Sequence, residues 1–243
     1  MRELLRDRHA RDDAGLFVAE GPRVVSAALS ANAPIERVYA DPDQPVAREA
    51  TAAGIDVVPI DRAAADRIGI TVTPQPVFAI VTLQRLDVSA LDGATLAIVG
   101  APISDPGNAG TIMRSAAASG ADVVVLGSGS VDAYNPKVVR ASAGACFAIR
   151  TVEGVTAVEA LERLGAQNVR RLAATAHGGS VPEALDLSAP TAFVLGSEAH
   201  GLPADLPVDD RVSIPMHAGE SLNVAMAATV LLHEAARQRR GVS

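Results

Sequence analysis

Three polar loops in the C-terminal half of this 243-residue chain carry side chains that could orient and polarise a bound substrate. The first loop, within SDPGNAGTIMR, contains Asn108 and, less than two helical turns further on, Arg114. The second, VLGSEAHGLP, contains Glu198, and the third, SIPMHAGESLNVAMAA, contains Ser221 and Asn223. Each loop follows an apolar segment that reads as a strand. Because the carboxyl ends of parallel strands share one edge of a sheet, we expect the loops to meet in one ligand site.

The first loop has the layout of a nucleotide site without the usual motif. Residues 101–126 run from a strand end through a loop of Pro, Gly and Asn into a helix and then a second strand. This layout is typical of a nucleotide-type ligand, yet the stretch contains no G-x-G-x-x-G and no P-loop lysine. A nucleotide-dependent α/β enzyme is therefore a weaker alternative.

Taken singly, each of these polar residues has a structural explanation. Asn108 could be the N-cap of the next helix, Arg114 a surface ion-pair partner, Glu198 a solvated acid and Ser221 a second N-cap. Their placement after three strands of one sheet edge favours a shared functional role. The single cysteine, Cys146, excludes an intramolecular disulfide and a cysteine-based metal cluster, and we expect no metal site.

Alternating strands and helices must position these loops. In residues 1–83 we expect helices at 22–32, 45–54 and 61–68, with Asp61 as an N-cap, and strands at 35–40, 55–60 and 76–83. Further on we expect strands at 95–100, 122–127, 146–152, 170–176, 191–196 and 211–216, and helices at 109–119, 136–145, 155–165 and 221–239. The later strands are short and apolar on both faces, which predicts a parallel sheet covered by helices. The fold class is therefore α/β.

The polar stretch QRLDVSALDG, at residues 84–93, marks the boundary between two alternating units. We expect an N-terminal domain with its linker at 1–90 and a second domain at 91–243.

No apolar run reaches the roughly 20 residues that span a bilayer, and the N-terminus carries no signal pattern, so we expect a cytoplasmic protein with no membrane partner. Net charge is −7, which argues against general nucleic-acid binding. Lys137 is the only lysine, which we attribute to genomic composition.

Longer stretches of the chain resemble one protein family. NAGTIMRSAAASGADVVVL, FVLGSEAHGLP and VSIPMHAGESLNVAMAATVLLHEAARQR resemble the three motifs of the SpoU/TrmH family of RNA ribose 2′-O-methyltransferases, within the SPOUT superfamily. NPKVVRASAGA, at 135–145, is also similar to the family. Residues 1–82, with FVAEGPRVV, resemble the small L30e-like substrate-binding domain often found ahead of the catalytic domain.

The resemblance implies a catalytic SPOUT domain with a deep trefoil knot at 91–243 and an RNA substrate-binding domain at 1–90. The knot should hold S-adenosylmethionine. The positions that match the family's cofactor contacts are Ala174, Thr175, Ala176, Leu195, Gly196, Ile214, Met216, Ser221 and Leu222. Such a pocket needs no G-x-G-x-x-G because this cofactor carries no phosphate.

The resemblance also implies roles for the polar residues. Arg114 matches the arginine that helps to deprotonate or polarise the ribose hydroxyl. A lowered pKa could make it a base, although arginine ordinarily has a pKa above about 12. Alternatively it stays charged, orients a phosphate and stabilises the forming alkoxide, which we favour. Asn108, Glu198, Ser221 and Asn223 would orient Arg114 and the target nucleotide.

The family's site is completed across a two-fold interface, which implies a homodimer. The expected substrate is 23S ribosomal RNA, contacted through the basic side chains Arg8, Arg11, Arg23 and Arg140. Asp12 and Asp13 depart from the more basic pattern of relatives and weaken the RNA role of the first helix. The alternatives are a tRNA ribose methyltransferase and a non-catalytic RNA-binding or ribosome-assembly factor.

Overall fold

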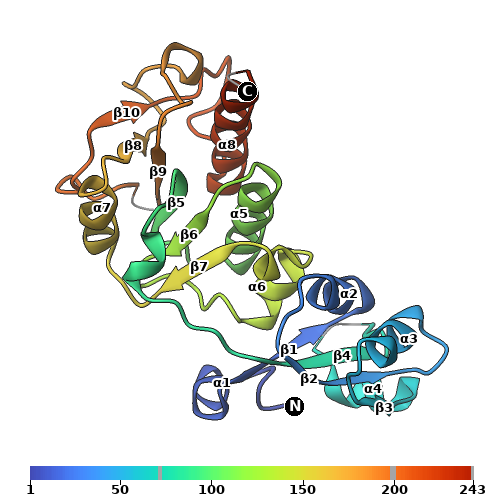
Figure 1. The fold of residues 1–243 in the computed structure, drawn as a ribbon. Helices are drawn as coiled ribbons and strands as arrows, with labels where there is room; N and C mark the ends of the chain where they lie inside the picture. The colour runs from blue at the N-terminus through green and yellow to red at the C-terminus, as the bar shows by residue number, and fades with distance from the viewer. Residues whose placement is uncertain (71–72, 198–200, 242–243) are drawn as a thin grey trace. The chain divides into compact units, whose positions relative to one another are not determined.

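The computed structural model describes residues 1–70, 73–197 and 201–241. The chain forms two compact units, and neither is a single stretch of sequence (Figure 1). The first unit contains Met1–Gln84 and Tyr134–Ala148, and the second contains Arg85–Ala133 and Ile149–Ser243. The chain therefore passes between the units three times, which the predicted single boundary after residue 90 does not take into account.

The first unit is a four-stranded sheet with helices, in the strand order β1-β4-β2-β3. β1 pairs antiparallel with β4, β4 antiparallel with β2, and β2 parallel with β3. Its strands are β1 (Leu16–Glu20), β2 (Ile35–Ala40), β3 (Val57–Pro59) and β4 (Val77–Thr82); its helices are α1 (Arg8–Ala14), α2 (Pro22–Ser30), α3 (Pro45–Ala52), α4 (Arg62–Ile68) and α6 (Pro136–Ala141), with a 3-10 turn η2 (Ala145–Phe147). Asp61 caps α4 as predicted, accepting from the Ala64 N–H at 2.7 Å. The sequence did not indicate β1, because its apolar run is short and follows a charged helix.

Aromatic packing draws residues 134–148 into the first unit. The ring of Phe17 on β1 lies 4.8 Å from that of Tyr134 and 6.0 Å from that of Phe147, measured between centroids. Gly144, at φ +97°, lies against Ala27 of α2 so closely that an added Cβ would stand 2.2 Å from the Ala27 Cβ. These non-local contacts give α6 its place, although its sequence lies between two strands of the other unit.

The second unit is a six-stranded sheet in the order β10-β8-β9-β5-β6-β7, and every strand pair in it is parallel. Its strands are β5 (Leu96–Ala101), β6 (Val123–Leu126), β7 (Arg150–Glu153), β8 (Arg170–Ala174), β9 (Thr191–Gly196) and β10 (Asp210–Val212); its helices are α5 (Pro106–Ala118), α7 (Ala157–Gly165) and α8 (Val224–Arg240), with 3-10 turns η1 (Val88–Leu91) and η3 (Pro182–Ala184). The predicted α/β class and parallel sheet are confirmed. The trefoil knot stays a prediction.

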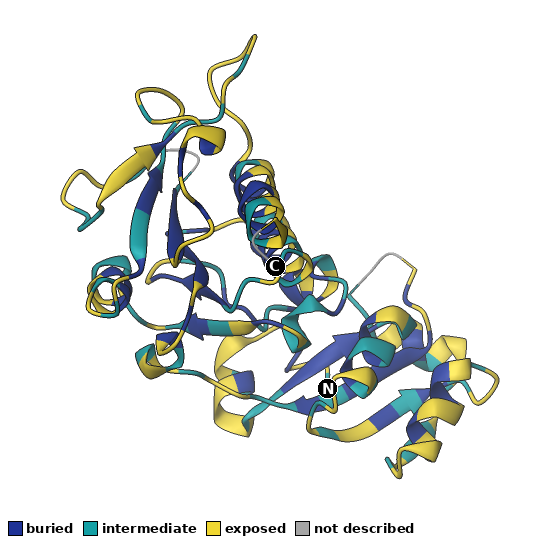
Figure 2. Cartoon of the chain, turned by 45° about the horizontal axis from the view of Figure 1, so that its top comes forward, coloured by how far each residue is buried: buried dark blue, intermediate teal, exposed yellow. Residues whose placement is uncertain are grey.

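Helices cover both faces of this sheet, with α7 on one face and α5 and α8 on the other (Figure 1). β5 and β6 are buried along their whole length, and central strands appear in dark blue in Figure 2. Ala97 and Val99 of β5 belong to the same apolar cluster as Leu161 and Leu164 of α7. No helix among the described residues has both the length and the apolar character needed to cross a bilayer.

The start of α5 differs from the prediction. Asp105, and not Asn108, is the N-cap: its carboxylate accepts the backbone N–H of Asn108 at 2.8 Å, and Pro106 occupies the first turn. Proline suits that position because its ring presets the helical φ and its missing N–H is not needed there. The helix therefore begins three residues earlier than expected, and the Asn108 side chain is available for a tertiary contact.

Candidate functional site

A cavity of about 430 Å³ opens in the second unit where β8, β9 and β10 end. This volume is within the range of small-molecule sites. Three separated segments line it, and together they contain every residue that the sequence assigned to cofactor contact: Ala174, Thr175, Ala176, Leu195, Gly196, Ile214, Met216, Ser221 and Leu222. The carboxyl edge of the sheet thus brings together positions up to 48 residues apart.

The sequence did not single out all of the lining. Val224, Ala227 and Leu231 of α8 also face the cavity, at a spacing of three and four residues. That helical periodicity could have identified them, because such positions share one face of a helix. Ser197, Gly201, Leu202 and Val212 complete the lining.

Close backbone packing shapes the wall behind β9. Ser197 and Gly201 pair through two backbone hydrogen bonds of 3.1 and 2.9 Å. An added Cβ on Gly196 would lie 2.4 Å from the Gly201 carbonyl carbon, so only glycine fits at position 196. Glycine at this position therefore lets the Gly201–Leu202 backbone pack directly against the end of β9, and residues of both segments line the cavity.

The cavity wall holds a buried hydroxyl. Thr175 Oγ1 is buried and has no hydrogen-bond partner among the residues that the structure describes. The Thr175 backbone is fixed by its N–H donating to the Val212 carbonyl at 2.9 Å. An unpaired buried hydroxyl costs roughly 1 to 3 kcal/mol, so the arrangement favours a ligand that supplies the missing partner.

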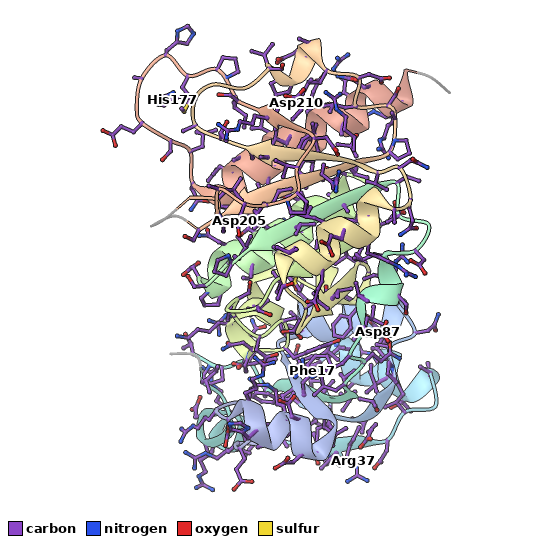
Figure 3. The ribbon with its side chains drawn as sticks, turned by 90° about the vertical axis from the view of Figure 1, so that its left-hand side faces the viewer. Phe17, Arg37, Asp87, His177, Asp205 and Asp210 are labelled. Atoms are coloured by element: carbon purple, nitrogen blue, oxygen red, sulfur yellow. The ribbon has the colours of Figure 1, made fainter. Side chains whose placement is uncertain are left out.

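Ion pairs anchor β10 beside β8, below the cavity. Arg170 Nη2 lies 2.9 Å from Asp210 Oδ2, and Arg171 Nε donates to Asp209 Oδ2 at 2.9 Å. The Arg171 guanidinium holds the pKa of the Asp209 carboxyl below its usual value through this hydrogen bond. Figure 3 shows Asp210 on this edge strand and His177 in the loop after β8. Among residues 1–70, 73–197 and 201–241, no three His, Cys, Asp or Glu side chains gather as a metal site would require.

Two asparagines join the cavity to α5. Asn223 lines the cavity and caps α8, because its Oδ1 accepts from Ala225 N at 2.9 Å and from Met226 N at 3.3 Å. Its Nδ2 donates to Asn108 Oδ1 at 3.1 Å. One side chain thus uses its acceptor for the helix and its donor for Asn108, which fixes the orientation of both amides.

The remaining predicted catalytic residues lie in different places. Ser221 lines the cavity and is exposed. Arg114 is exposed on α5 and does not line the cavity; it makes no hydrogen bond or ion pair with any described residue. Glu198 lies outside the described residues. The structure therefore brings Asn108, Asn223 and Ser221 together and leaves Arg114 on a neighbouring surface.

The four arginines predicted to bind RNA all lie in the first unit. Arg23 and Arg140 are exposed. Arg8 is exposed and pairs with Asp12 at 3.5 Å. Arg11 is only 3% exposed, and its Nη1 donates to the Leu4 carbonyl at 2.7 Å. Burial excludes Arg11 from direct RNA contact in this structure, since its guanidinium holds the N-terminal turn against α1.

Comparisons with known proteins agree on one family. Residues 95–233 match the SpoU rRNA Methylase family, and residues 2–79 match the MRM3-like substrate binding domain. The chain is 31% identical to the 23S rRNA (uridine(2479)-2′-O)-methyltransferase of Streptomyces viridochromogenes, over 97% of this chain and 88% of that protein. It is 28% identical to the 23S rRNA (guanosine(2553)-2′-O)-methyltransferase RlmP of Bacillus subtilis, over 94% of this chain and 92% of that protein.

Solved structures are similar over nearly the whole chain. The SpoU methyltransferase AviRb of Streptomyces viridochromogenes, in complex with the cofactor AdoMet, superposes with a TM-score of 0.86 at 29% identity, covering 98% of this chain and 96% of that one. Among relatives compared by sequence alone, an uncharacterized tRNA/rRNA methyltransferase of Synechocystis is 35% identical over 71% of this chain. The matched part covers 64% of that relative's length.

Proposed function

Because the chain belongs to the SpoU rRNA methylase family, we propose that it transfers the methyl group of S-adenosylmethionine to a ribose 2′-hydroxyl of RNA. The observation that carries the proposal is the convergence of three loop segments on one cavity beside the Asn108–Asn223 pair. When bound, the cofactor supplies an electrophilic methyl group on its sulfonium.

The residues of the cavity suit this cofactor. The lining is mostly apolar side chain and backbone, which fits an adenine ring and a methionine chain, and nothing in it is built to cradle phosphate. Thr175 Oγ1 is a buried hydroxyl that lacks a partner among the described residues, and a polar atom of the cofactor can pair with it. Gly196 lets the Gly201–Leu202 backbone pack closely against β9 and so shapes the cavity wall.

The protein's polar groups must help the ribose hydroxyl to lose its proton. Arginine keeps its charge in proteins, so we assign Arg114 the task of orienting a phosphate and stabilising the forming alkoxide. Asn108 and Asn223 hold one another in a single orientation, which gives the nucleotide a fixed hydrogen-bonding group. Ser221 and Glu198 belong to the same loops and are assigned to orienting the nucleotide.

A homodimer accounts for the position of Arg114. Met226 and Val230 are 62% and 42% exposed, and their spacing of four puts them on one side of α8, where they form an apolar stripe. A hydroxyl pair, Ser115 with Thr229 at 2.7 Å, joins this helix to α5, which carries Arg114. A second copy covering the apolar stripe would bring each Arg114 toward the partner's cavity.

The names of the relatives favour 23S ribosomal RNA as the substrate of this chain. Such a substrate would place the enzyme in the cytoplasm. Arg8, Arg23 and Arg140 are the exposed arginines among the predicted RNA contacts, and Arg8 pairs with Asp12. A tRNA substrate or a non-catalytic RNA-binding factor is less favoured, because relatives that match nearly the whole chain are named as 23S rRNA 2′-O-methyltransferases.

Two measurements test the proposal. Titration calorimetry should detect binding of S-adenosylmethionine, and absence of heat at high ligand concentration would contradict the assigned cofactor. Mapping of ribose methylation on total RNA from cells with and without the gene should reveal one lost site in 23S RNA. A lost site in tRNA would overturn the substrate, and no lost site would favour the binding factor.

A further inference from the structure

The short helix α6 presents two cations on one side of the first unit. Lys137 and Arg140 are three residues apart, so their side chains are neighbours on the helix surface. Both are exposed, whereas Val138 and Val139 between them are buried, Val139 in the core of the first unit. We call this pair the α6 cation face.

The α6 cation face stands on a rigid support. Asn135 caps the helix by accepting the Lys137 backbone N–H at 2.9 Å. Tyr134 donates its hydroxyl to the Gln84 carbonyl at 2.5 Å, and its ring packs on Phe17. The two cations therefore project from a helix that the core holds in place, and little order must be gained when they bind a partner.

No acidic residue accompanies the two cations in their own segment. Residues 134–148 contain no Asp or Glu. Some other cations of the first unit pair with a neighbouring acid, as in Arg37–Asp56 at 2.8 Å and Arg62–Asp66 at 3.1 Å. Lys137 and Arg140 form no ion pair or hydrogen bond through their side chains with any residue that the structure describes. A site that leaves two neighbouring cations unpaired suits an anionic partner.

The charge of residue 137 suits a phosphate as partner. A lysine ammonium is a compact point charge with three donors that can contact a phosphate group, and the Arg140 guanidinium can do the same. Among the described residues, all the large apolar side chains that are exposed lie in the second unit. A protein partner usually binds through buried apolar or aromatic anchor residues, and the α6 cation face offers none for it to contact.

We propose that the α6 cation face binds the phosphate backbone of the RNA substrate, with Lys137 and Arg140 each contacting one phosphate. The inference rests on the proposed RNA substrate and adds Lys137, which the sequence motifs did not assign to RNA. It also makes α6, although it is encoded between two strands of the catalytic sheet, part of the RNA-binding surface of the first unit.

Salt dependence tests the proposal. Affinity for a 23S RNA transcript is measured by filter binding from 50 to 300 mM KCl for wild type and for Lys137→Ala/Arg140→Ala. Each lost phosphate contact lowers the slope of log affinity against log salt by about 0.7 to 0.9, so the double variant should lose about 1.4 to 1.8. Arg67→Ala removes another exposed, unpaired cation of the first unit and should keep the wild-type slope. Lys137→Arg keeps the charge and should do the same.

An unchanged slope in the double variant would overturn the proposal, as would an equal loss in Arg67→Ala or a loss in Lys137→Arg. S-adenosylmethionine affinity of all variants should equal that of wild type, because the cavity lies in the second unit. If wild type itself binds the transcript without salt dependence, the proposed RNA substrate fails, which is a different outcome.

The single lysine offers a second, independent readout. Acetylation with an amine-reactive reagent can modify only Lys137 and the N-terminal amine, and mass spectrometry resolves the two. Bound RNA should slow acetylation of Lys137 several-fold relative to the N-terminal amine. Equal rates with and without saturating RNA would refute the contact.

Discussion

Substituting Asn223 by Asp separates the structural task of this residue from its functional one. Asn223 Oδ1 caps α8 and its Nδ2 donates to Asn108 Oδ1 at 3.1 Å. Asp caps helices as well as Asn does, and its charge is favourable at a helix N-terminus by about 0.3 to 1 kcal/mol. It cannot donate to Asn108, which removes a hydrogen bond worth about 0.5 to 1.5 kcal/mol. The two effects offset, so the free energy of unfolding should stay within about 1 kcal/mol of wild type.

The functional consequence should be larger. Facing a carboxylate, the Asn108 amide would have to turn by 180° to donate, which reverses the group that it presents toward the substrate. We expect Asn223→Asp to lower methyl transfer by about 10 to 100-fold, equivalent to about 1.4 to 2.7 kcal/mol of transition-state stabilisation. Asn223→Ala should lose similar activity and, in addition, about 1 kcal/mol of stability through the lost cap.

Denaturant unfolding followed by circular dichroism and incorporation of labelled methyl groups into RNA measure the two quantities. Thr156→Ala is the matched control, because Thr156 caps α7 away from the cavity and its loss should reduce stability but not turnover. Full activity in Asn223→Asp would refute the role of the amide pair. Stability as low as in Asn223→Ala would refute the capping argument.

Three further changes test other parts of the structure. Arg114→Ala should keep S-adenosylmethionine affinity in calorimetry while methyl transfer falls by about 10² to 10⁴-fold; near-normal turnover would remove its assigned role. Met226→Glu should give a folded monomer in light scattering, whereas an unchanged mass would contradict the proposed interface. Hydrogen bonds from Arg237 and Gln238 lower the pKa of Glu234 from 4.5 to about 2, so its contribution to stability should be present above about pH 4.5 and be lost as pH falls toward 2. Glu234→Gln should weaken that acid dependence; an identical pH profile would contradict it.

Local sequence patterns predicted most elements of both units. Apolar runs placed β2 and β9 at their observed bounds, and turn residues marked the ends of most helices. The strand expected at 146–152 begins only at Arg150, because residues 145–147 form a 3-10 turn that packs with the first unit. The hydrophobic periodicity of a segment and the helix or strand propensities of its residues describe that segment alone. They carry no information about which sheet the segment joins.

Within the candidate site, the second and third motifs and the strand end at 174–176 line the cavity, since loops after parallel strands share one edge. The first motif does not line the cavity and is joined to it through the Asn108–Asn223 hydrogen bond. The sequence by itself thus determined the α/β class, the strands and the loops that could hold a ligand. Only the tertiary structure decided that Arg11 is buried, that α6 belongs to the first unit, and that Asn223 pairs with Asn108, 115 residues away. Those outcomes depend on close packing and hydrogen bonding between distant residues, which no periodicity along the chain encodes.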